Sequence, residues 1–417
     1  MGKKMRKLSL VLTLGPLVLG ATIGVGSAQA QLDPSFGQGG TAAVDLPGSV
    51  QAMGAASDGS SYVLTDSWKC AAECEVSYSL FRYTSDARLD AGFGGPTGVS
   101  EPRADQEARM SLAVDSQGLP LLAETGREGI VIRRFTESGA PDPTFGADGV
   151  VELKCGCLYS PSRILPTATG GLTVLESGSS SLGVLRVFRL RADGSADPRF
   201  GKRGVAGFSL PHAESVTTAA ASQRGAIYFA GPVCCHFSKT LYLARIAARG
   251  KLDTRFLSTA RHSLNSIGKF RKSRTTINAV VPRPGGKIDL LGFTARSKGF
   301  LLRLNPDGHR DRGFGRGGLR MLPFPVVSAD LGSDGAVLAV TDTNRPAGGA
   351  VLRILPSGRI DPTFTPRQIP GSAGDTGMSI VHLSGRSSLL LDLGLHECRT
   401  LPCAYDPKLI RYLEPAP

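Results

Sequence analysis

Eight cysteines are the residues of this chain whose type and spacing best suit covalent chemistry. They fall in four close pairs: Cys70 with Cys74, Cys155 with Cys157, Cys234 with Cys235, and Cys398 with Cys403. An even number of cysteines in an exported chain favours disulfides over free thiols. Because the N-terminal segment described below predicts export, we expect all eight to form disulfides.

Three interpretations of the cysteine pairs remain open. In the first, each close pair forms a local disulfide, although the neighbours Cys234 and Cys235 would need a strained bridge that is easily reduced. In the second, these two pair with Cys155 and Cys157 across adjacent repeats, which would relieve the strain. In the third the thiolates bind a metal, but no further Cys-x-x-Cys or His pair completes a zinc site. We therefore expect no metal and no other cofactor.

A basic run at residues 269–274 is a candidate binding loop for an anion or a partner. Its charged residues are Lys269, Arg271, Lys272 and Arg274, and Phe270 lies among them. An aromatic ring within a basic run can contact nucleic acid or an anionic polysaccharide. The alternative is a solvated loop, and export argues against nucleic acid. The expected partner is thus an unidentified protein or an anionic polymer at the cell envelope.

Motifs of known enzyme classes are missing from the sequence. It contains no Gly-x-Ser-x-Gly elbow, Walker loop or His-Glu-x-x-His helix, and its six histidines show no metal-like pairing. Carboxylates from different repeats could still converge as an acid–base pair. We therefore expect no catalytic residue and take a binding scaffold as the first hypothesis. An exported glycan lyase or hydrolase is the second.

The first thirty residues have the pattern of a signal peptide. A basic start is followed by an apolar stretch, and Ala28-Gln29-Ala30 fits a peptidase site. We expect a secreted or envelope protein of residues 31–417, with no transmembrane segment after cleavage. The whole chain carries a net charge of +13, and loss of four basic residues leaves +9. We expect this moderate basicity to be spread over most repeats.

Seven copies of one signature position these groups. The first reads Leu-Asp-Pro-Ser-Phe-Gly, and its phenylalanine recurs 50 to 58 residues apart. The aspartate and phenylalanine of each copy are Asp33 and Phe36, Asp90 and Phe93, Asp142 and Phe145, Asp197 and Phe200, Asp253 and Phe256, Asp311 and Phe314, and Asp361 and Phe364. Such a period predicts a repeat architecture, with repeats at about 32–88, 89–140, 141–195, 196–251, 252–309, 310–359 and 360–417.

Each repeat has the pattern of four short strands. In the sixth these are expected at 319–322, 325–331, 336–340 and 350–354, separated by Gly, Asp and Pro turns. The third and fourth strands are apolar on both faces, as in sheets stacked around an axis. The sequence therefore predicts an all-β fold, a seven-bladed β-propeller of four-stranded antiparallel blades. A β-solenoid is the alternative, but the period is too long for one rung.

Two further regularities accompany the signature. An arginine stands eleven residues before each phenylalanine, with Arg411 equivalent at the chain end; the set is Arg82, Arg134, Arg189, Arg245, Arg303, Arg353 and Arg411. Because an unpaired buried charge is costly, we expect each to be held by an aspartate or by signature-turn carbonyls. The alternative is a ring of arginines binding an anion in the channel. Where Leu257 and Thr365 replace the signature glycine, we expect a different turn.

The signature resembles that of the delta-60 repeat family of bacterial exported proteins. The resemblance rests on Leu32–Gly37, Pro141–Gly146 and Ile360–Phe364 and extends over the exported part. It implies a propeller-like domain and supplies no catalytic residues.

The ends of the chain predict a closed ring. The last repeat stops where another signature would follow, and the exported chain begins with that signature. Closure removes unpaired sheet edges, and we expect a monomer. Strand alternation places all eight cysteines on one face, which we expect to be the interaction surface.

Overall fold

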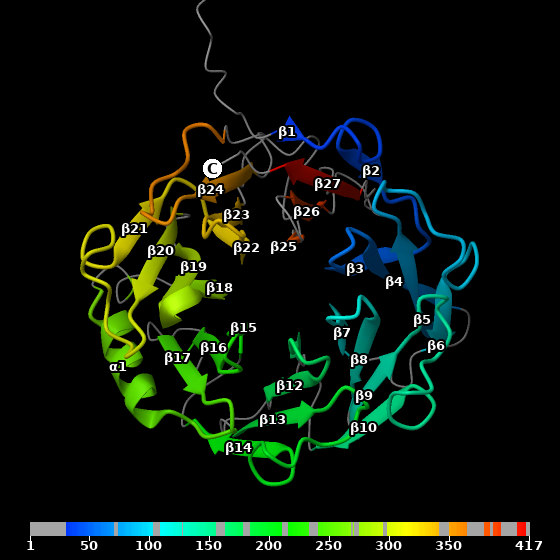
Figure 1. Cartoon of the computed structure of the whole chain (residues 1–417), viewed down its shortest axis with the longest axis horizontal. Coiled ribbons are helices and arrows are strands. Elements are labelled where there is room, and N and C mark those ends of the chain that lie inside the picture. Colours follow the sequence, from blue (N-terminus) through cyan, green and yellow to red (C-terminus); the bar gives the residue numbers. More distant parts are fainter. Residues whose placement is uncertain are drawn as a thin grey trace, which may run out of the picture.

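Seven antiparallel sheets surround a central axis (Figure 1). The computed structural model describes residues 31–70, 74–102, 109–126, 128–155, 163–177, 184–210, 216–232, 241–267, 270, 275–294, 298–341, 350–364, 379–383, 387–392 and 407–413. Within these ranges the chain is a seven-bladed β-propeller, so the predicted fold class is confirmed. The expected strands of the sixth repeat agree with the observed ones to within two residues.

Blades one to three each contain four strands, numbered from the axis outward. Blade one comprises β3 (Ser49–Ala55), β4 (Ser61–Cys70), β5 (Cys74–Tyr83) and β6 (Val99–Pro102). Blade two comprises β7 (Arg109–Val114), β8 (Pro120–Thr125), β9 (Gly129–Arg134) and β10 (Val150–Lys154). Blade three comprises β11 (Arg163–Pro166), β12 (Leu172–Ser177), β13 (Val184–Leu190) and β14 (Val205–Ser209).

Blades four to six follow the same order, except that a helix takes the place of the outer strand in blade four. Blade four comprises β15 (Thr218–Ala221), β16 (Ile227–Pro232), β17 (Leu241–Ile246) and the helix α1 (Thr254–Asn265). Blade five comprises β18 (Thr275–Pro282), a 3₁₀ turn at Pro284–Gly286, β19 (Ile288–Thr294), β20 (Lys298–Leu304) and β21 (Leu319–Leu322). The described strands of blade six are β22 (Val326–Leu331), β23 (Val337–Thr341) and β24 (Ala350–Ile354).

Blade seven joins the two ends of the described chain and closes the ring. Its strands are β25 (Ser379–His382), β26 (Ser387–Asp392) and β27 (Lys408–Leu413), with β1 (Gln31–Leu32) and β2 (Thr41–Ala43) paired to β27. Thr41 lies opposite Ile410, and Gln31 lies opposite Leu413. The N-terminal signature therefore supplies the outer edge of the last blade, as the chain ends predict.

A blade and a sequence repeat are offset by one strand. Where a strand follows a signature in the described ranges, it forms the outer edge of the blade that precedes it; β21, for example, pairs with β20. Blades one, two, three and five therefore draw their inner three strands from one repeat and their outer strand from the next. Blade seven takes its outer strands from the first repeat. The signature itself forms the turn between the third and the outer strand.

Burial on both faces explains why the middle strands carry apolar residues on both faces. In β19, Ile288 and Leu290 pack in the core between blades four and five, while Leu291 packs in the core between blades five and six. All three are completely buried. Burying a side chain of this size stabilises the fold by roughly 1.5–3 kcal/mol. The stacked sheets thus take their stability from their neighbours, as a repeat architecture requires.

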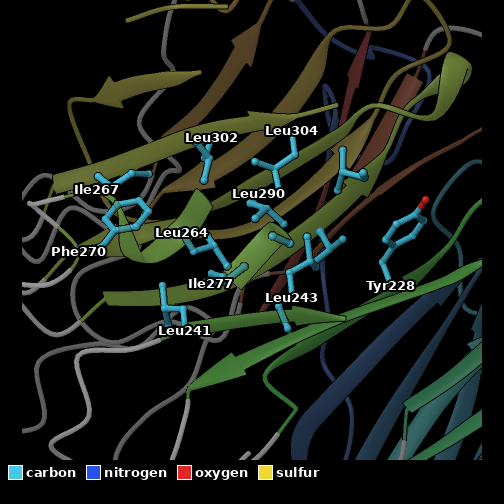
Figure 2. Packing of buried hydrophobic residues seen from close by; sticks show 14 of the residues in the cluster. Tyr228, Leu241, Leu243, Leu264, Ile267, Phe270, Ile277, Leu290, Leu302 and Leu304 are labelled. Atoms are coloured by element: carbon cyan, nitrogen blue, oxygen red, sulfur yellow. The ribbon is translucent and has the colours of Figure 1, made fainter. Parts of the chain in front are cut away.

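Helix α1 replaces the outer strand of blade four. The carboxylate of Asp253 caps the helix by accepting a hydrogen bond of 2.9 Å from the amide of Phe256. Phe256, Ala260 and Leu264 follow at helical spacing and are buried against β17 and blade five. Figure 2 shows Leu264 in this core. The changed turn expected where Leu257 replaces glycine is therefore the first turn of a helix. Blade four departs in this respect from the predicted four strands.

No helix within the described ranges is long and apolar enough to cross a bilayer.

Candidate functional site: a basic arc and a pocket on the signature-turn face

Strand direction sorts the loops of the propeller onto two faces. The connections from inner to second strand and from third to outer strand, which include the signatures, emerge on one face. We call it the signature-turn face. The ends of β4 and β5 at Cys70 and Cys74, and Cys155 after β10, lie toward the opposite face.

The cysteines are placed only in part. Cys70 and Cys74 are directly opposite residues in the β4–β5 ladder. Cys155 follows β10 and is disulfide-bonded, and its partner lies outside the described side chains. The connectivity of all eight cysteines stays a prediction, because five of them lie outside the described ranges: Cys157, Cys234, Cys235, Cys398 and Cys403.

The basic run after α1 loses the aromatic contact that made it a candidate for stacking. Phe270 is 1% exposed and its ring centroid lies 4.6 Å from that of Phe300 in the core of blade five. A buried ring cannot stack on a base or a sugar, so that part of the expectation is wrong. The charged residues Lys269, Arg271, Lys272 and Arg274 lie outside the described ranges.

The repeated arginines and aspartates lie together at the signature turns. Five of the seven arginines form an ion pair with the aspartate of their own signature: Arg82–Asp90, Arg134–Asp142, Arg245–Asp253, Arg353–Asp361 and Arg411–Asp33. Pairing compensates the cost of removing these charges from water. Each of these arginines is therefore held by its own turn.

The signature phenylalanines are all buried beside these pairs. Their exposed fractions do not exceed 3%; the set is Phe36, Phe93, Phe145, Phe200, Phe256, Phe314 and Phe364. An arginine guanidinium lies over the ring in five cases: Arg134–Phe145, Arg189–Phe200, Arg245–Phe256, Arg303–Phe314 and Arg411–Phe36. Phe93 packs edge-to-face against Tyr62 with ring centroids 5.4 Å apart. The repeated rings are thus part of the core and offer no surface to a ligand.

The same arginines reach across to the next blade. Arg134 donates a hydrogen bond of 2.7 Å to the carbonyl of Ala192, and Arg245 donates one of 2.6 Å to that of Pro306. Arg303 donates similarly to Pro356. These acceptors occupy the same position in the signature-face turn of the following blade. The arginine contacts accordingly run from blade to blade rather than into the central channel.

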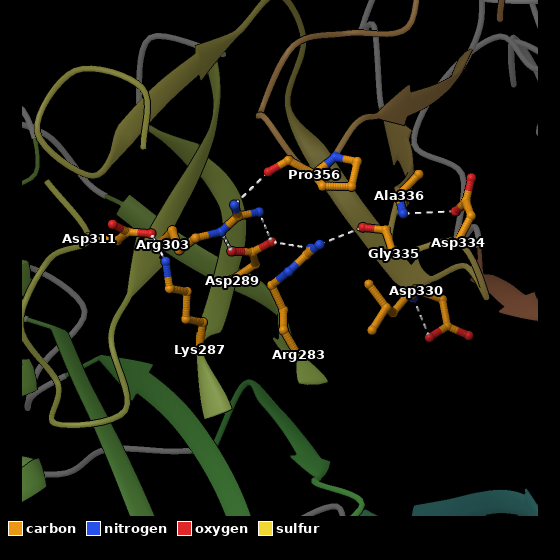
Figure 3. A network of polar contacts seen from close by, with 11 residues as sticks. Arg283, Lys287, Asp289, Arg303, Asp311, Asp330, Asp334, Gly335, Ala336 and Pro356 are labelled. Atoms are coloured by element: carbon orange, nitrogen blue, oxygen red, sulfur yellow. Dashed lines mark hydrogen bonds and ion pairs between the residues drawn. The ribbon is translucent and has the colours of Figure 1, made fainter. Parts of the chain in front are cut away.

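Two blades depart from the pairing. Arg189 of blade three forms no ion pair with Asp197 of its signature, or with any other carboxylate in the described part of the chain. Its guanidinium donates a hydrogen bond of 3.4 Å to the carbonyl of Gly225. Burial lowers the pKa of Arg189. In blade five, Arg303 pairs with Asp289 of β19 at 2.6 Å instead of with Asp311, which pairs with Lys287 at 2.7 Å (Figure 3).

Asp289 also links blades five and six. It is completely buried, and Arg283 donates to it at 2.8 Å and to the carbonyl of Gly335 in blade six (Figure 3). Both arginines of this group thus bond a turn of the next blade. Their contacts are those of a blade joint and leave little capacity for a ligand.

Charge, in contrast, is distributed very unevenly around the ring. Residues 184–321, from β13 to β21, contain 26 Lys and Arg against 7 Asp and Glu, a net charge of +19. The remainder of residues 31–417, namely 31–183 and 322–417, contains 18 against 28, a net charge of −10. The expected even spread of basicity is therefore wrong. The positive charge is concentrated in blades three to five.

Ten exposed basic side chains of these blades lie at the signature-turn face, nine in its connections and Arg255 in the first turn of α1. We call this set the basic arc; its members are Arg191, Arg199, Lys202, Arg203, Arg224, Arg249, Lys251, Arg255, Arg312 and Arg316. None of them forms an ion pair with another described residue. Only Asp193 and Asp307 are exposed acids in the described part of the same connections. The arc is therefore an unneutralised positive surface.

The arc is not part of the repeated scaffold. The residue before the signature phenylalanine is Arg199 or Arg255 in two of the arc's repeats. In the remaining repeats the same position holds Ser35, Gly92, Thr144, Gly313 and Thr363. A scaffold that accepts such different residues does not need the arginine. The net charge of each repeat, counted from the sequence, would have indicated the basic arc.

A pocket of about 400 Å³ opens beside the arc between blades four and five. Its walls come from the inner-to-second turns of the two blades, 222–226 and 282–286, and from Ala247, Ala248 and Pro306. The ionisable groups of its lining are Tyr228, Arg245, Asp253, Arg283 and Arg224, and the last of these belongs to the basic arc. The pocket is therefore mostly apolar with a few convergent polar groups, as ligand sites are.

Of the ionisable groups of the pocket, Arg245 is paired with Asp253, and Arg283 is paired with Asp289. Burial would raise the pKa of Asp253, but the Phe256 amide and the Arg245 guanidinium outweigh it and hold that pKa below its usual range. Burial lowers the pKa of Arg245, yet hydrogen bonds with Asp253 and Tyr228 outweigh it and leave the pKa raised. Asp253 is thus an ionised acceptor, poorly suited to act as a general base.

Metal sites are not found in the part of the chain with described side chains. No group of three or more His, Cys, Asp or Glu residues there lies close enough to hold a metal ion.

Comparison with known proteins gives a likeness in fold. No family model matches the sequence, and no curated protein matches it. Among solved structures, the polysaccharide lyase Uly1 is similar with a TM-score of 0.51 and 9% identity, over 91% of this chain and 92% of that one. Prolyl oligopeptidase B from Galerina marginata gives 0.49 and 14%, over 88% and 49%. A puromycin hydrolase gives 0.45 and 16%, over 86% and 51%. At 9% identity the likeness to the lyase shows the fold alone.

Proposed function

We propose that this propeller is an exported binding protein that holds an anionic polymer of the cell envelope on its basic arc. The basic arc carries the proposal, because ten exposed cations without acidic partners among the described residues lie on one face of three adjacent blades. Neutralising a row of fixed charges releases counterions from both partners and favours association with a polyanion. A small ligand would not need a positive surface that extends over three blades.

Binding is favoured over catalysis by the state of the pocket beside the arc. The carboxylate in its lining, Asp253, caps a helix and pairs with Arg245 at 2.6 Å. A lyase or hydrolase would need a group free to take a proton from its substrate. The function proposed for this face is therefore retention of a polymer rather than its cleavage.

The repeat position of Lys251 offers a matched test of the arc. Lys251, Arg88 and Arg359 all stand five residues before a signature phenylalanine, and all are exposed, but only Lys251 belongs to the arc. We expect the protein to bind alginate, a polyuronate, and not neutral dextran. The double variant Lys251→Glu, Arg255→Glu should lose at least about tenfold in alginate affinity and show a flatter dependence on salt.

The control is the double variant Arg88→Glu, Arg359→Glu, which makes the same change in net charge at the repeat position of Lys251 in two blades outside the arc. It should keep the affinity of the unmodified protein within about twofold. Equal losses in the two variants, or no alginate binding at low salt, would show that the arc does not hold a polyanion. Tighter binding to polyphosphate than to alginate would show that the polymer is not a polyuronate, while the arc would remain the binding surface for a polyanion.

Export is proposed from the N-terminal segment and has its own test. The mature protein isolated from its source should begin at Gln31. A mature chain that retains residues 1–30 would contradict cleavage of a signal peptide, and with it the proposed location at the cell envelope.

A further inference from the structure

We propose that the pocket between blades four and five binds a single carboxylate-bearing sugar unit. This inference rests on the proposed polymer-binding function and names the group that the site selects. Arg224 belongs both to the basic arc and to the lining of the pocket. A polyanion lying on the arc therefore passes the mouth of the pocket.

The size of the pocket suits one unit of a polymer rather than a chain. Its volume of about 400 Å³ lies near the lower end of the range for small-molecule sites. Pro284 and Pro306 face it from blade five, and Ala226, Ala247 and Ala248 face it from blade four. These small side chains offer apolar surface to the C–H face of a sugar ring, and they occupy less space than an aromatic ring would.

The charges of the pocket distinguish a carboxylate from a phosphate. Arg224 is exposed and has no ion-pair partner among the described residues, so its guanidinium can pair with one carboxylate. Arg245 cannot add much, because Asp253 and the carbonyl of Pro306 already accept from it at 2.6 Å each. A dianionic phosphate would find one available cation and a nearby negative Asp253. A monoanion is the better fit.

Asp253 supplies the second half of the recognition. Each of its oxygens accepts one hydrogen bond, from Phe256 or from Arg245, and each can accept another. An ionised carboxylate accepts hydrogen bonds from sugar hydroxyls, and Tyr228 adds a hydroxyl group to the lining of the pocket. One available guanidinium beside one acceptor carboxylate thus matches a unit that carries both an acid and hydroxyl groups.

The test uses the full exported chain with glucuronate, glucose and inorganic phosphate as probes in calorimetric or NMR titrations. We expect glucuronate to bind and glucose and phosphate to bind at least about tenfold more weakly, since each lacks one of the two recognised groups. Arg224→Ala should weaken glucuronate binding by about tenfold or more, with partial recovery in Arg224→Lys. Ala248→Phe should abolish it by filling the pocket.

The control is Arg359→Ala, which removes an exposed arginine of blade six and should leave glucuronate binding unchanged. Thermal unfolding of each variant shows whether a loss comes from misfolding, and Arg224 and Ala248 are both exposed in the free protein. No glucuronate binding at 50 mM ligand, on the order of the weakest affinity that a titration detects, would overturn this inference. Binding unaffected by Ala248→Phe, or tighter binding of phosphate, would do the same.

Failure of the pocket and failure of the arc give different results. If alginate binds through the arc and glucuronate does not bind, the pocket is not a subsite, and the proposed function stands. If glucuronate binds and the arc variants hold alginate as well as the unmodified protein, the arc proposal fails instead.

Discussion

The guanidinium of Arg134 on β9 donates a hydrogen bond of 2.7 Å to the carbonyl oxygen of Ala192, which lies in the next blade. The same side chain pairs with Asp142 at 2.7 Å and is 4% exposed. One residue therefore ties its own signature turn to the turn of its neighbour. The equivalent arginines of blades four and five make the same crossing, so the scaffold is joined on the signature-turn face by charged groups.

Replacing Arg134 with methionine should destabilise the propeller. Asp142, 5% exposed, would lose its cationic partner, and leaving a buried charge unpaired costs about 3–5 kcal/mol. Chemical denaturation at pH 7 measures the change in unfolding free energy. Arg320→Met, at an exposed position on β21, is the control and should change that free energy by less than about 0.5 kcal/mol. Equal stability of the two variants would mean that Arg134 is not a joint.

Acid should loosen the same joints. Burial would raise the pKa of Asp142, but hydrogen bonds from Thr144 and the charge of Arg134 outweigh it, so the folded pKa lies below the ordinary value of 3.8. The pKa values of Asp33 and Asp361 are lowered for corresponding reasons. A lowered folded pKa stabilises the protein above the unfolded pKa, and this stabilisation is lost as pH falls toward the folded one.

Unfolding free energy should therefore be nearly constant from neutral pH down to about pH 5 and fall below about pH 4. Denaturant titrations between pH 3 and 7 measure this profile. Asp142→Asn should be less stable at pH 7 and less sensitive to acid. A variant with the same acid slope as the unmodified protein would contradict the assignment of the effect to these aspartates.

Removal of residues 31–44 should open the ring. Phe36 and Val44 of this segment are buried in the core between blades seven and one, and β1 and β2 cover the edge of β27. Without them β27 presents unpaired backbone groups that favour association between molecules. Size-exclusion chromatography should show aggregates, and thermal unfolding should occur at lower temperature. A shortened chain that stays monomeric and equally stable would show that closure is not needed.

Two glycines separate backbone strain from crowding at the joints. Gly358 has φ +82°, and a Cβ there would lie 2.4 Å from the Phe314 ring of the preceding blade. Gly317 has φ +63°, and a Cβ there would meet nothing within 4 Å. Gly317→Ala should cost about 1 kcal/mol from strain alone. Gly358→Ala should cost about 1–3 kcal/mol more from overpacking. If denaturant titrations show equal losses of unfolding free energy in the two variants, crowding against Phe314 does not contribute to the loss at Gly358.

Periodicity made most of the fold predictable from the sequence. The spacing of the phenylalanines gives the number of blades, and the apolar runs on both strand faces indicate stacked sheets. The match between the two chain ends gives closure, which the Thr41–Ile410 pairing confirms. The offset between repeat and blade did not follow, because a strand after a turn can pair with either neighbour until the whole ring is assembled.

The candidate site was less predictable because it lies in what the repeats do not share. Leu257 indicated a changed turn, but a helix required the Asp253 cap and the apolar spacing of Phe256, Ala260 and Leu264 to act together. The pocket depends on how the 282–286 turn of one blade faces Ala247 and Ala248 of another. That relation is set by packing between blades. The basic arc could have been found by counting charges in each repeat.

The uneven charge of the ring gives the molecule a preferred direction. Blades three to five carry +19 and the rest of residues 31–417 carries −10, so the ring has an electric dipole that lies in its own plane (Figure 1). Near a negative wall or polymer mesh such a dipole feels a torque before it makes any contact. It would turn its green and yellow blades toward the wall. Blade seven, where the two ends of the chain meet, would then face away.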